Sequence, residues 1–237
     1  MSEQEKDVKT RMRQVRSFVR REGRLSSRQI RALDQLWPEY GIEYEEKLLD
    51  LDQLFSPNHP NTNPITLEIG FGMGASYIET IQAQPNTNFI GIEVHRPGVG
   101  TFLNRAVANK LTNIKVLKHD AVEVLKHMIP DGSLDKVQIF FPDPWPKKKH
   151  NKRRIVQPDF MNIITQKLTS NGILHLATDW ENYAEHMLEV LESVEGLTNQ
   201  AGENQYAPRP EDRPLTKYEQ RGQRLGHGVW DLVFVKS

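Results

Sequence analysis

The sequence predicts an α/β fold built on a doubly wound, mostly parallel sheet. Two observations carry this prediction. From Ile65 onward, short apolar runs alternate with amphipathic segments, which is the rhythm of β-α-β units. A glycine-rich stretch follows the first apolar run, where such folds turn from strand to helix. At 237 residues the chain is long enough for one such domain with an extension.

Six apolar runs predict strands, and four amphipathic segments predict helices between them. Pro97 suits the first turn of a helix, and Pro85 helps to end the preceding one. The polar, proline-bearing stretch 201–214 predicts a loop before the last strand. The expected strands are 65–70, 88–94, 114–120, 134–141, 172–179 and 228–236. The expected helices are 74–84, 97–111, 160–170 and 182–194.

The residues before the first strand predict an extension. Residues 42–55 space Leu48, Leu51 and Phe55 at helical intervals, which predicts a helix that packs on the main domain. Three prolines and three asparagines in 56–64 are typical of a linker. We therefore expect three parts: a basic extension with a packing helix over 1–56, a linker over 57–64, and one α/β domain over 65–237.

The charges cancel overall but are unevenly distributed. The chain has 31 Lys and Arg against 31 Asp and Glu, yet residues 1–31 hold ten basic and four acidic residues. Residues 147–154 hold six basic residues and no acidic one. Two basic blocks on an acidic body favour local binding to a polyanion such as nucleic acid. The alternative is a solvated face plus a tail that is disordered until a partner binds. A helical first block would align the arginines at 13, 16, 20, 24, 28 and 31 on one face.

Composition excludes several classes of site. Without cysteine the chain has no disulfide, no thiolate nucleophile and no thiolate metal ligand. Its eight histidines form no H-x-x-x-H pair, so no metal is expected. No run approaches the roughly 20 apolar residues that cross a bilayer, and the charged start lacks the apolar stretch of a secretory signal. We therefore expect a cytoplasmic protein without a membrane segment.

The stretch LEIGFGMGAS indicates a cofactor site. Gly70, Gly72 and Gly74 let the chain turn tightly and let a cofactor approach the backbone at a helix N-terminus. Gly70, Gly72 and Ala75 also match the G-x-G-x-x-A pattern of dinucleotide sites, and a strand-to-helix turn can use glycine for structure alone. The glycines by themselves leave these alternatives open.

Carboxylates at the ends of three successive expected strands indicate which cofactor this site would bind. Glu93 follows Gly74 by 19 residues, where it can accept hydrogen bonds from both ribose hydroxyls of an adenosine. Asp120 can accept from an adenine amino group, and Glu68 can meet a cationic amino-acid tail. S-adenosylmethionine carries a sulfonium and an ammonium and no phosphate. An acidic lining therefore favours it over NAD, which remains the alternative.

A proline-stiffened loop, FFPDPWP, ends the fourth expected strand. Prolines at 142, 144 and 146 fix φ, so Asp143 and Trp145 are held at the carboxyl edge of the sheet. There they could receive a flat base, or Trp145 could be buried and anchor the loop. The six cations of KKKHNKRR, the next residues of the chain, are expected to face water or phosphate.

Together these motifs resemble those of the bacterial single-subunit tRNA (guanine-N7)-methyltransferases. The resemblance rests on LEIGFGMG, IEVHRPG, FFPDPWPKKKHNKRRI, ATDWENYA and RPLTKYEQRGQRLGHGVWDL, and it runs from Ile65 to the C-terminus. It implies a class I methyltransferase (Rossmann-like) domain over 65–237 with a seven-stranded sheet. It also implies transfer of a methyl group from S-adenosyl-L-methionine to N7 of a guanosine in tRNA, at position 46 in the variable loop.

The resemblance also implies roles for individual residues of this chain. For Asp179 and residues 216–219 it is the only basis of the assignment. With the glycines, the expected cofactor site comprises Glu68, Gly70, Gly72, Gly74, Glu93, Asp120 and Asp143. The expected substrate-binding residues are Lys147, Asp179, Thr216, Lys217, Tyr218 and Glu219. The expected RNA contacts are Lys148, Lys149, His150, Asn151, Lys152 and Arg153.

Guanine N7 is an unprotonated lone pair, so the transfer needs no general base. The protein has to hold the two reactants about 3 to 3.5 Å apart and to favour the positive charge that appears on the guanine. Asp143 is the expected catalytic residue. Asp179 or Glu219 could accept from guanine N1–H and the exocyclic amine, a pairing that adenine does not offer.

Two rival functions come from other classes. An RNA-binding protein that has lost its nucleotide site would use the basic blocks alone, but the four acids at strand ends argue against it. A nicotinamide-dependent dehydrogenase would need a His or Tyr acid at a strand end, which is not obvious here, and it leaves the cations unexplained. We expect tRNA as the partner, no obligatory protein partner, and a monomer or homodimer.

Overall fold

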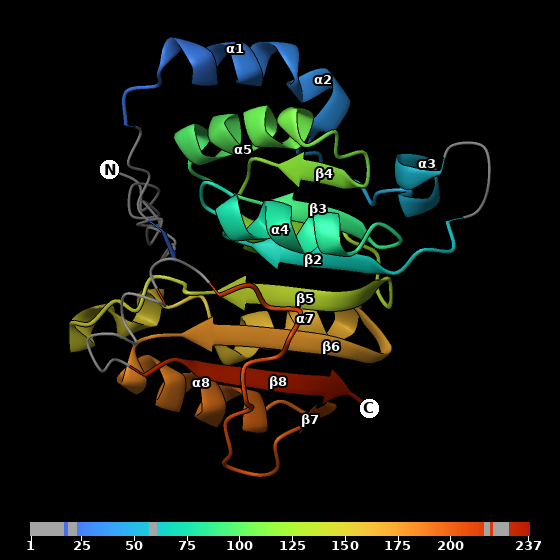
Figure 1. The fold of residues 1–237 in the computed structure, drawn as a ribbon. Coiled ribbons are helices and arrows are strands. Elements are labelled where there is room, and N and C mark those ends of the chain that lie inside the picture. The colour runs from blue at the N-terminus through green and yellow to red at the C-terminus, as the bar shows by residue number, and fades with distance from the viewer. Residues whose placement is uncertain (1–16, 19–22, 57–60, 216–218, 220–227) are drawn as a thin grey trace, which may run out of the picture.

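A sheet of eight strands runs through the molecule, with helices on both of its faces (Figure 1). The computed structural model describes residues 17–18, 23–56, 61–215, 219 and 228–237. The strands are β1 (Gly41–Ile42), β2 (Ile65–Ile69), β3 (Asn88–Ile92), β4 (Ile114–Leu117), β5 (Leu134–Phe140), β6 (Leu168–Thr178), β7 (Leu197–Asn199) and β8 (Trp230–Lys236).

Helices and one 3-10 turn connect the strands. They are α1 (Ser27–Gln35), α2 (Trp37–Tyr40), α3 (Leu51–Phe55), α4 (Ala75–Ala83), α5 (Arg96–Ala108), α6 (Ala121–His127), η1 (Lys148–Arg153), α7 (Pro158–Lys167) and α8 (Glu181–Glu192). The helices α1 and α4 both pack on α5, and the three share one apolar cluster, while α6 and α8 both pack on α7 in a second. In the view of Figure 1, α4 lies in front of the sheet and α7 behind it.

The strand order β1-β4-β3-β2-β5-β6-β8-β7 contains the reversal of a doubly wound sheet. The chain winds outward from β2 through β3 to β4 and then returns to β5 on the other side of β2. The pairs from β1 to β6 are parallel, whereas β8 runs antiparallel to both β6 and β7. A crevice therefore opens where β2 and β5 end, at the edge to which both strands carry their last residues.

The central strands are buried over their whole length. All five residues of β2 and all five of β3 are buried, because helices cover both faces of this part of the sheet. The buried residues therefore include polar ones, Thr66 and Glu68 on β2 and Asn88 on β3. The polar residues directly after such strands are held at a fixed edge of a rigid layer.

The predicted doubly wound α/β fold is confirmed, and the six expected strands and four expected helices are all present. The structure adds α6 and the short strand β7, which the alternation of apolar and amphipathic segments does not predict. The sheet has eight strands rather than seven, because β1 from the extension pairs in parallel with β4.

The prediction of one helix over 42–55 is wrong. Ile42 belongs to β1, and a helix begins only at Leu51, because the Asp50 side chain caps it by accepting from the backbone N–H of Gln53 at 3.0 Å. Leu48 is 57% exposed, but Leu51 belongs to the core and Phe55 packs against it, so the expected packing is confirmed for these two residues. The helical spacing of its leucines arises from a strand, a bend and a short helix in succession.

Part of the basic extension is built into the fold through α1. The Ser26 side chain accepts from the backbone N–H of Gln29, and the Gln29 side chain accepts from that of Ser26, which is a capping box. The Gln29 amide also donates to the Pro97 carbonyl of α5 at 3.2 Å. A Cβ added at Gly100 of α5 would lie 2.9 Å from the Gln29 carbonyl oxygen, so the two helices approach closely because this residue is glycine.

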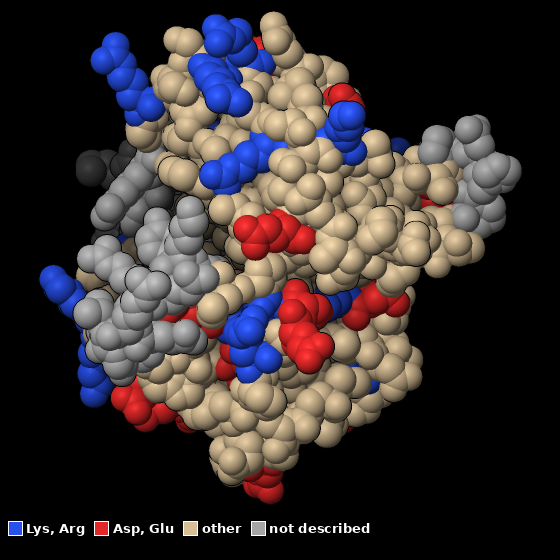
Figure 2. All heavy atoms as spheres, viewed as in Figure 1, with Lys and Arg blue, Asp and Glu red and all other residues tan. Residues whose placement is uncertain are grey.

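Three of the six arginines expected to share one helix face are exposed: Arg24 just before α1, and Arg28 and Arg31 on it. Figure 2 shows Lys and Arg side chains gathered over α1, at the top of the view. Arg13, Arg16 and Arg20 lie outside the described residues. Within the part of the chain that the structure describes, no helix has the length and apolar character to cross a membrane, and no three His, Asp or Glu side chains are grouped to hold a metal ion.

We expect Gly100→Ala to lower the free energy of unfolding. Overpacking costs about 1 to 3 kcal/mol, and here the added Cβ meets backbone, which cannot rotate away. The gain in helix propensity is about 1 kcal/mol, so a net loss of about 1 kcal/mol remains. Urea unfolding measures it. Gly23→Ala is the control, because a Cβ there meets nothing within 4 Å. A Gly100→Ala protein more stable than the wild type would contradict the close packing of α1.

Candidate active site

A cavity of about 380 Å³ opens at the carboxyl edge of the sheet, on the side to which the arrowheads of β4, β5 and β6 point in Figure 1. We call it the edge cavity. Its wall is formed by residues at and after the ends of β2, β3, β4 and β5, together with Ser17 and Phe18 from the extension. Of the predicted cofactor residues, those that line it are Gly70, Glu93, Asp120 and Asp143.

The glycine-rich turn brings backbone to this cavity. Gly70 and Gly74 have φ of +82° and +70°, the left-handed region that favours glycine. A Cβ on Gly74 would lie 2.3 Å from the ring of Phe102, so a larger residue there would push the turn away from α5. Gly72 and Gly74 do not line the edge cavity themselves. They shape the turn that places Gly70 there.

Glu93 joins two segments of the cavity wall. Its Oε2 accepts a hydrogen bond from the backbone N–H of Gly72, and its Oε1 accepts one from that of His95, both at 2.8 Å. The side chain is only 8% exposed yet lines the cavity. Each carboxylate oxygen has a second acceptor position, so Glu93 can hold the wall together and still accept from a ligand.

Asp120 is fixed at the start of α6. Its Oδ1 accepts from the backbone N–H of Val122 at 3.0 Å, which caps the helix. The preceding residue, His119, also lines the cavity and stacks on Tyr44 with ring centroids 3.7 Å apart. A residue from the extension therefore supports the side of the cavity formed by β4.

Glu68 lies inside the sheet rather than in the cavity lining. It is 5% exposed in the middle of β2, between Gly91 of β3 and Gln138 of β5. Burial, together with the negative charge of Glu93, raises the pKa of Glu68 to about 8, although Lys136 opposes the shift. This carboxyl is therefore mostly protonated near neutral pH.

The proline-stiffened loop leaves β5 with a constrained backbone. Phe141 and Trp145 have φ of +49° and +45°, values that cost bulky residues conformational energy. Between them Asp143 is exposed and lines the edge cavity. The loop thus presents one carboxylate at the mouth of the cavity on a backbone with little freedom.

Trp145 is partly buried rather than buried, and its contacts anchor the loop. The guanidinium of Arg153 lies 4.0 Å from the centroid of its ring, and His150 meets it edge-on at 5.9 Å. Its Nε1 donates to the Ser17 carbonyl at 3.0 Å, and Arg153 donates to the Phe18 carbonyl at 3.3 Å. These contacts tie the extension to the loop beside the edge cavity.

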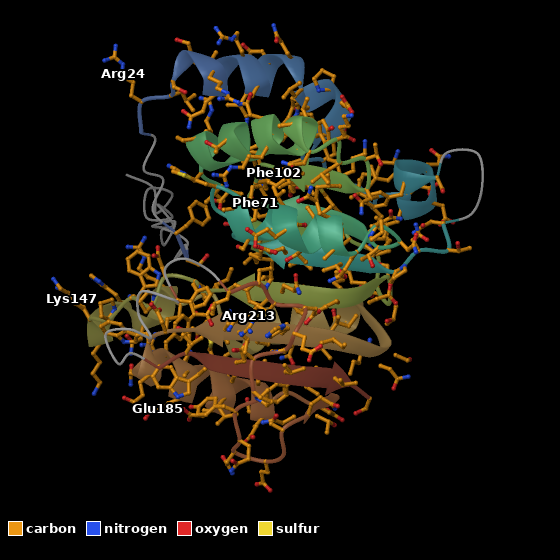
Figure 3. The ribbon with its side chains drawn as sticks, viewed as in Figure 1. Arg24, Phe71, Phe102, Lys147, Glu185 and Arg213 are labelled. Atoms are coloured by element: carbon orange, nitrogen blue, oxygen red, sulfur yellow. The ribbon has the colours of Figure 1, made fainter. Side chains whose placement is uncertain are left out.

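The basic run divides into exposed lysines and one buried arginine. Lys147, Lys148, Lys149 and Lys152 are exposed on η1 and just before it, and Figure 3 shows Lys147 directed away from the sheet. The expectation that all six cations face water or phosphate is wrong for Arg154.

Arg154 is 3% exposed and acts inside the protein. It donates to the Pro144 carbonyl at 3.0 Å and to Asn182 Oδ1 at 2.8 Å, and its guanidinium lies 4.7 Å from the centroid of the Tyr183 ring. It therefore holds the proline-stiffened loop to the start of α8.

The predicted substrate residues differ in accessibility. Asp179 is exposed directly after β6, at the same edge of the sheet. Glu219 is 3% exposed, and both its carboxylate oxygens accept from Arg213. Thr216, Lys217 and Tyr218 lie outside the described residues.

Sequence reasoning missed a buried polar cluster behind this edge. Arg213, Asp231 and His175 are each at most 2% exposed and hydrogen-bonded to one another through Asp231. The only sequence signal was a histidine inside the apolar run GILHLAT and an aspartate inside VWDLVFV. Nothing local in the loop 201–214 distinguishes Arg213 from an exposed arginine.

We expect the advantage of Glu68→Gln over the wild type to grow with pH. Glutamine resembles the protonated carboxyl. In the wild type the folded state holds a proton that the unfolded state releases above its ordinary pKa of about 4.5, so the contribution of Glu68 to stability is lost as pH rises to about 8. The difference in free energy of unfolding should change by up to about 1.4 kcal/mol per pH unit in this window. Urea unfolding at pH 5, 6.5 and 8 measures it.

The control is Glu79→Gln on α4, which changes an exposed glutamate and should show no such trend. Parallel stability curves for Glu68→Gln and wild type would show that this carboxyl is ionised in the folded protein.

Comparisons with known proteins agree with this fold. A family described as "Putative methyltransferase" matches residues 62–232. Among solved structures, the 16S rRNA methyltransferase KamB is similar with a TM-score of 0.56 at 14% identity, covering 81% of this chain and 95% of that one. Precorrin-6y C5,15-methyltransferase from Geobacter metallireducens is similar with a TM-score of 0.51 at 17% identity, covering 74% and 80%. At these identities the likeness concerns the fold alone.

Curated relatives are far more similar in sequence. A tRNA (guanine-N(7)-)-methyltransferase of Aeromonas hydrophila is 59% identical over 223 residues, which is 94% of this chain and 92% of that protein. Proteins of the same name from Klebsiella pneumoniae and Serratia proteamaculans are 57% and 56% identical, covering 94% and 95% of this chain and 92% and 93% of theirs. A chain that shares more than half its residues with these proteins over almost its whole length belongs to the tRNA (guanine-N(7)-)-methyltransferase family.

Proposed function

We propose that this protein transfers a methyl group from S-adenosyl-L-methionine to N7 of a guanosine in tRNA. Family membership supports the reaction, and the main structural support is the negative charge of the edge cavity. Position 46 in the variable loop is our proposal for the target, from the resemblance of the motifs. A cytoplasmic enzyme that works as a monomer or homodimer is likewise proposed.

The edge cavity fits S-adenosylmethionine better than NAD. Three carboxylates line it, and no Lys or Arg is among its described lining residues. A cofactor with a sulfonium and an ammonium is attracted by such a wall, whereas the pyrophosphate of NAD would face negative charge without a cation to pair with. The negative charge of the cavity wall therefore favours the sulfonium cofactor.

The cofactor residues have distinct proposed roles. Glu93 and Asp120 would accept from the ribose hydroxyls and the adenine amino group, and Gly70 lets the cofactor lie against the backbone. Glu68, behind this wall, gains its negative charge when a cation nearby lowers its pKa from about 8. When bound, the cofactor supplies an electrophilic methyl group on positively charged sulfur.

The residues of the chain position the reactants rather than move a proton. Guanine N7 already carries the lone pair that attacks, so the protein has to align it in line with the methyl group. We propose Asp143 as the catalytic residue: its exposed carboxylate lies at the mouth of the cavity and favours the positive charge that develops on the guanine.

Guanine recognition is proposed for acids that accept from N1–H and the exocyclic amine. Asp179 is exposed directly after β6, and Glu219, which is buried, is paired with Arg213 beside the Phe141 ring. Adenine has no N1–H and would leave these acceptors unpaired. Lys147 and the residues Thr216, Lys217 and Tyr218 complete the proposed substrate site from the family resemblance.

The remaining basic surface is proposed to bind the tRNA backbone. The proposed contacts are Lys148, Lys149, His150, Asn151, Lys152 and Arg153, with the exposed arginines Arg24, Arg28 and Arg31 as a second patch. Phosphate contacts of this kind set affinity and register without reading sequence.

The function is tested by incubating the protein with unmodified tRNA and S-adenosylmethionine labelled on its methyl group, then digesting the RNA and identifying the nucleosides. We expect 7-methylguanosine. The matched substrate carries 7-deazaguanosine at the target position, which removes only the attacking nitrogen. It should bind as well and accept no methyl group. Label on any other nucleoside, or transfer to the 7-deaza substrate, would contradict the proposed reaction.

We expect Asp143→Asn to slow transfer by about 100-fold, the loss typical of removing one group that stabilises developing charge. The substitution keeps the volume of the side chain, so affinity for tRNA should stay within a few-fold of wild type, and saturating cofactor offsets any loss of cofactor affinity. Single-turnover rates at saturating substrates measure the effect. A near-normal rate would exclude Asp143 from the catalytic role.

Replacing Lys148, Lys149 and Lys152 together with Gln should weaken the binding of all tRNAs to a similar extent. The slope of log K against log salt should become shallower by up to about 0.9 for each phosphate that the variant no longer neutralises, and by about 0.7 in single-stranded regions. Filter binding at several salt concentrations measures it.

The control removes three exposed lysines elsewhere, Lys47, Lys110 and Lys126, with the same change in net charge. The salt slope of that variant should remain close to the wild-type value. An equal change in both triple variants would mean that only total charge matters and that η1 is not a contact surface.

A further inference from the structure

The loop between β7 and β8 buries an arginine. Arg213 is 1% exposed, although the stretch 201–214 around it is polar and has no helix or strand. Figure 3 shows Arg213 lying against the sheet over β5 and β6. A fully buried guanidinium is costly unless its N–H groups are all engaged, so its partners indicate what it does.

The guanidinium bridges two carboxylates. Its Nη1 and Nη2 donate to the two oxygens of Glu219 at 2.7 and 2.6 Å, which is a bidentate pair. Its Nε and Nη2 donate to the two oxygens of Asp231 at 2.7 and 2.9 Å. Asp231 is fixed in turn on β8, since His175 Nε2 of β6 lies 2.8 Å from its Oδ1. Glu219 is thereby tied to two strands of the sheet.

The same guanidinium touches the wall of the edge cavity. It lies 5.6 Å from the ring centroid of Phe141 and 6.0 Å from that of Phe140, and both of these residues line the cavity. His175 packs edge-on against Phe140 with centroids 4.8 Å apart. Arg213 therefore connects the cavity wall, the sheet and Glu219 in one rigid group.

The cluster is better explained by positioning than by stability. Burial lowers the pKa of His175, so it is neutral near pH 7 and the cluster holds one cation against two carboxylates. Well-packed apolar side chains stabilise a core at least as well as buried ion pairs do. The two bidentate contacts add a fixed direction for the Glu219 carboxylate.

We infer that Arg213 is a positioning residue that holds the Glu219 carboxylate at a fixed place relative to the edge cavity, so that the exocyclic amine of the target guanine is recognised there. This inference rests on the proposed function. It goes beyond it by assigning guanine selectivity to a buried residue that does not touch the substrate.

The test compares single-turnover methylation of two tRNAs, one with guanosine and one with inosine at the target position. Inosine keeps N7 and N1–H and lacks only the exocyclic amine. The ratio of the two rates does not depend on the fraction of folded protein, so a merely structural defect does not change it. A hydrogen bond to a charged acceptor predicts a wild-type ratio of at least about tenfold.

Arg213→Lys keeps the positive charge and loses the bidentate fork. We expect it to reduce the guanosine-to-inosine ratio several-fold toward one, with S-adenosylhomocysteine affinity and tRNA affinity within about twofold of wild type. Asp231→Asn keeps the volume of its side chain and weakens the hydrogen bonds that fix Arg213 to β8. It should therefore also lower the ratio. It keeps the inference testable if Arg213→Lys does not fold.

Asp212→Asn is the matched control. Asp212 is the neighbour of Arg213 and pairs with Lys136 of β5 at 2.5 Å, so its change loosens the same loop without touching Glu219. Its ratio should equal that of wild type. An unchanged ratio in Arg213→Lys and Asp231→Asn, or an equal fall in Asp212→Asn, would overturn the inference. A wild-type protein that methylates neither tRNA would instead refute the proposed function.

Discussion

The two hydrogen bonds that Glu93 accepts from backbone N–H groups hold the edge cavity together. Gly72 belongs to the turn after β2, and His95 directly precedes α5 after β3, so one carboxylate fixes the ends of two elements relative to each other. The packing is tight at this point: a Cβ added at Gly98 of α5 would lie 2.5 Å from the Gly72 carbonyl oxygen. The position of Gly70 and the shape of that half of the cavity depend on this contact.

The acids of the cavity could be predicted from sequence because the strands before them are buried on both faces. The two strands end at Ile69 and Ile92, and their parallel order brings the residues after them to one edge. Local pattern was sufficient for Glu93 and Asp120. The same pattern does not reveal that Glu68 is buried on a central strand, and its place in the cofactor site stays a prediction.

The parts that could not be predicted depend on partners far apart in the chain. From the sequence, Arg154 looks like one more exposed cation of the run KKKHNKRR. In the structure it is buried against Asn182 and Tyr183. Residues 42–55 have helical spacing, but the exposed edge of β4 offers backbone partners to Ile42. Arg213 pairs with Asp231 across 18 positions, which no periodicity reveals. Tertiary contacts decide each of these cases.

The two ends of the sheet have a consequence for how copies of the protein meet. A long bare edge strand exposes a row of unpaired N–H and C=O groups and invites intermolecular pairing and aggregation. In the described chain the outermost strands are β1, with two residues, and β7, with three. The short piece contributed by the extension therefore covers part of the edge of β4. The sheet presents little backbone on which a second sheet could grow.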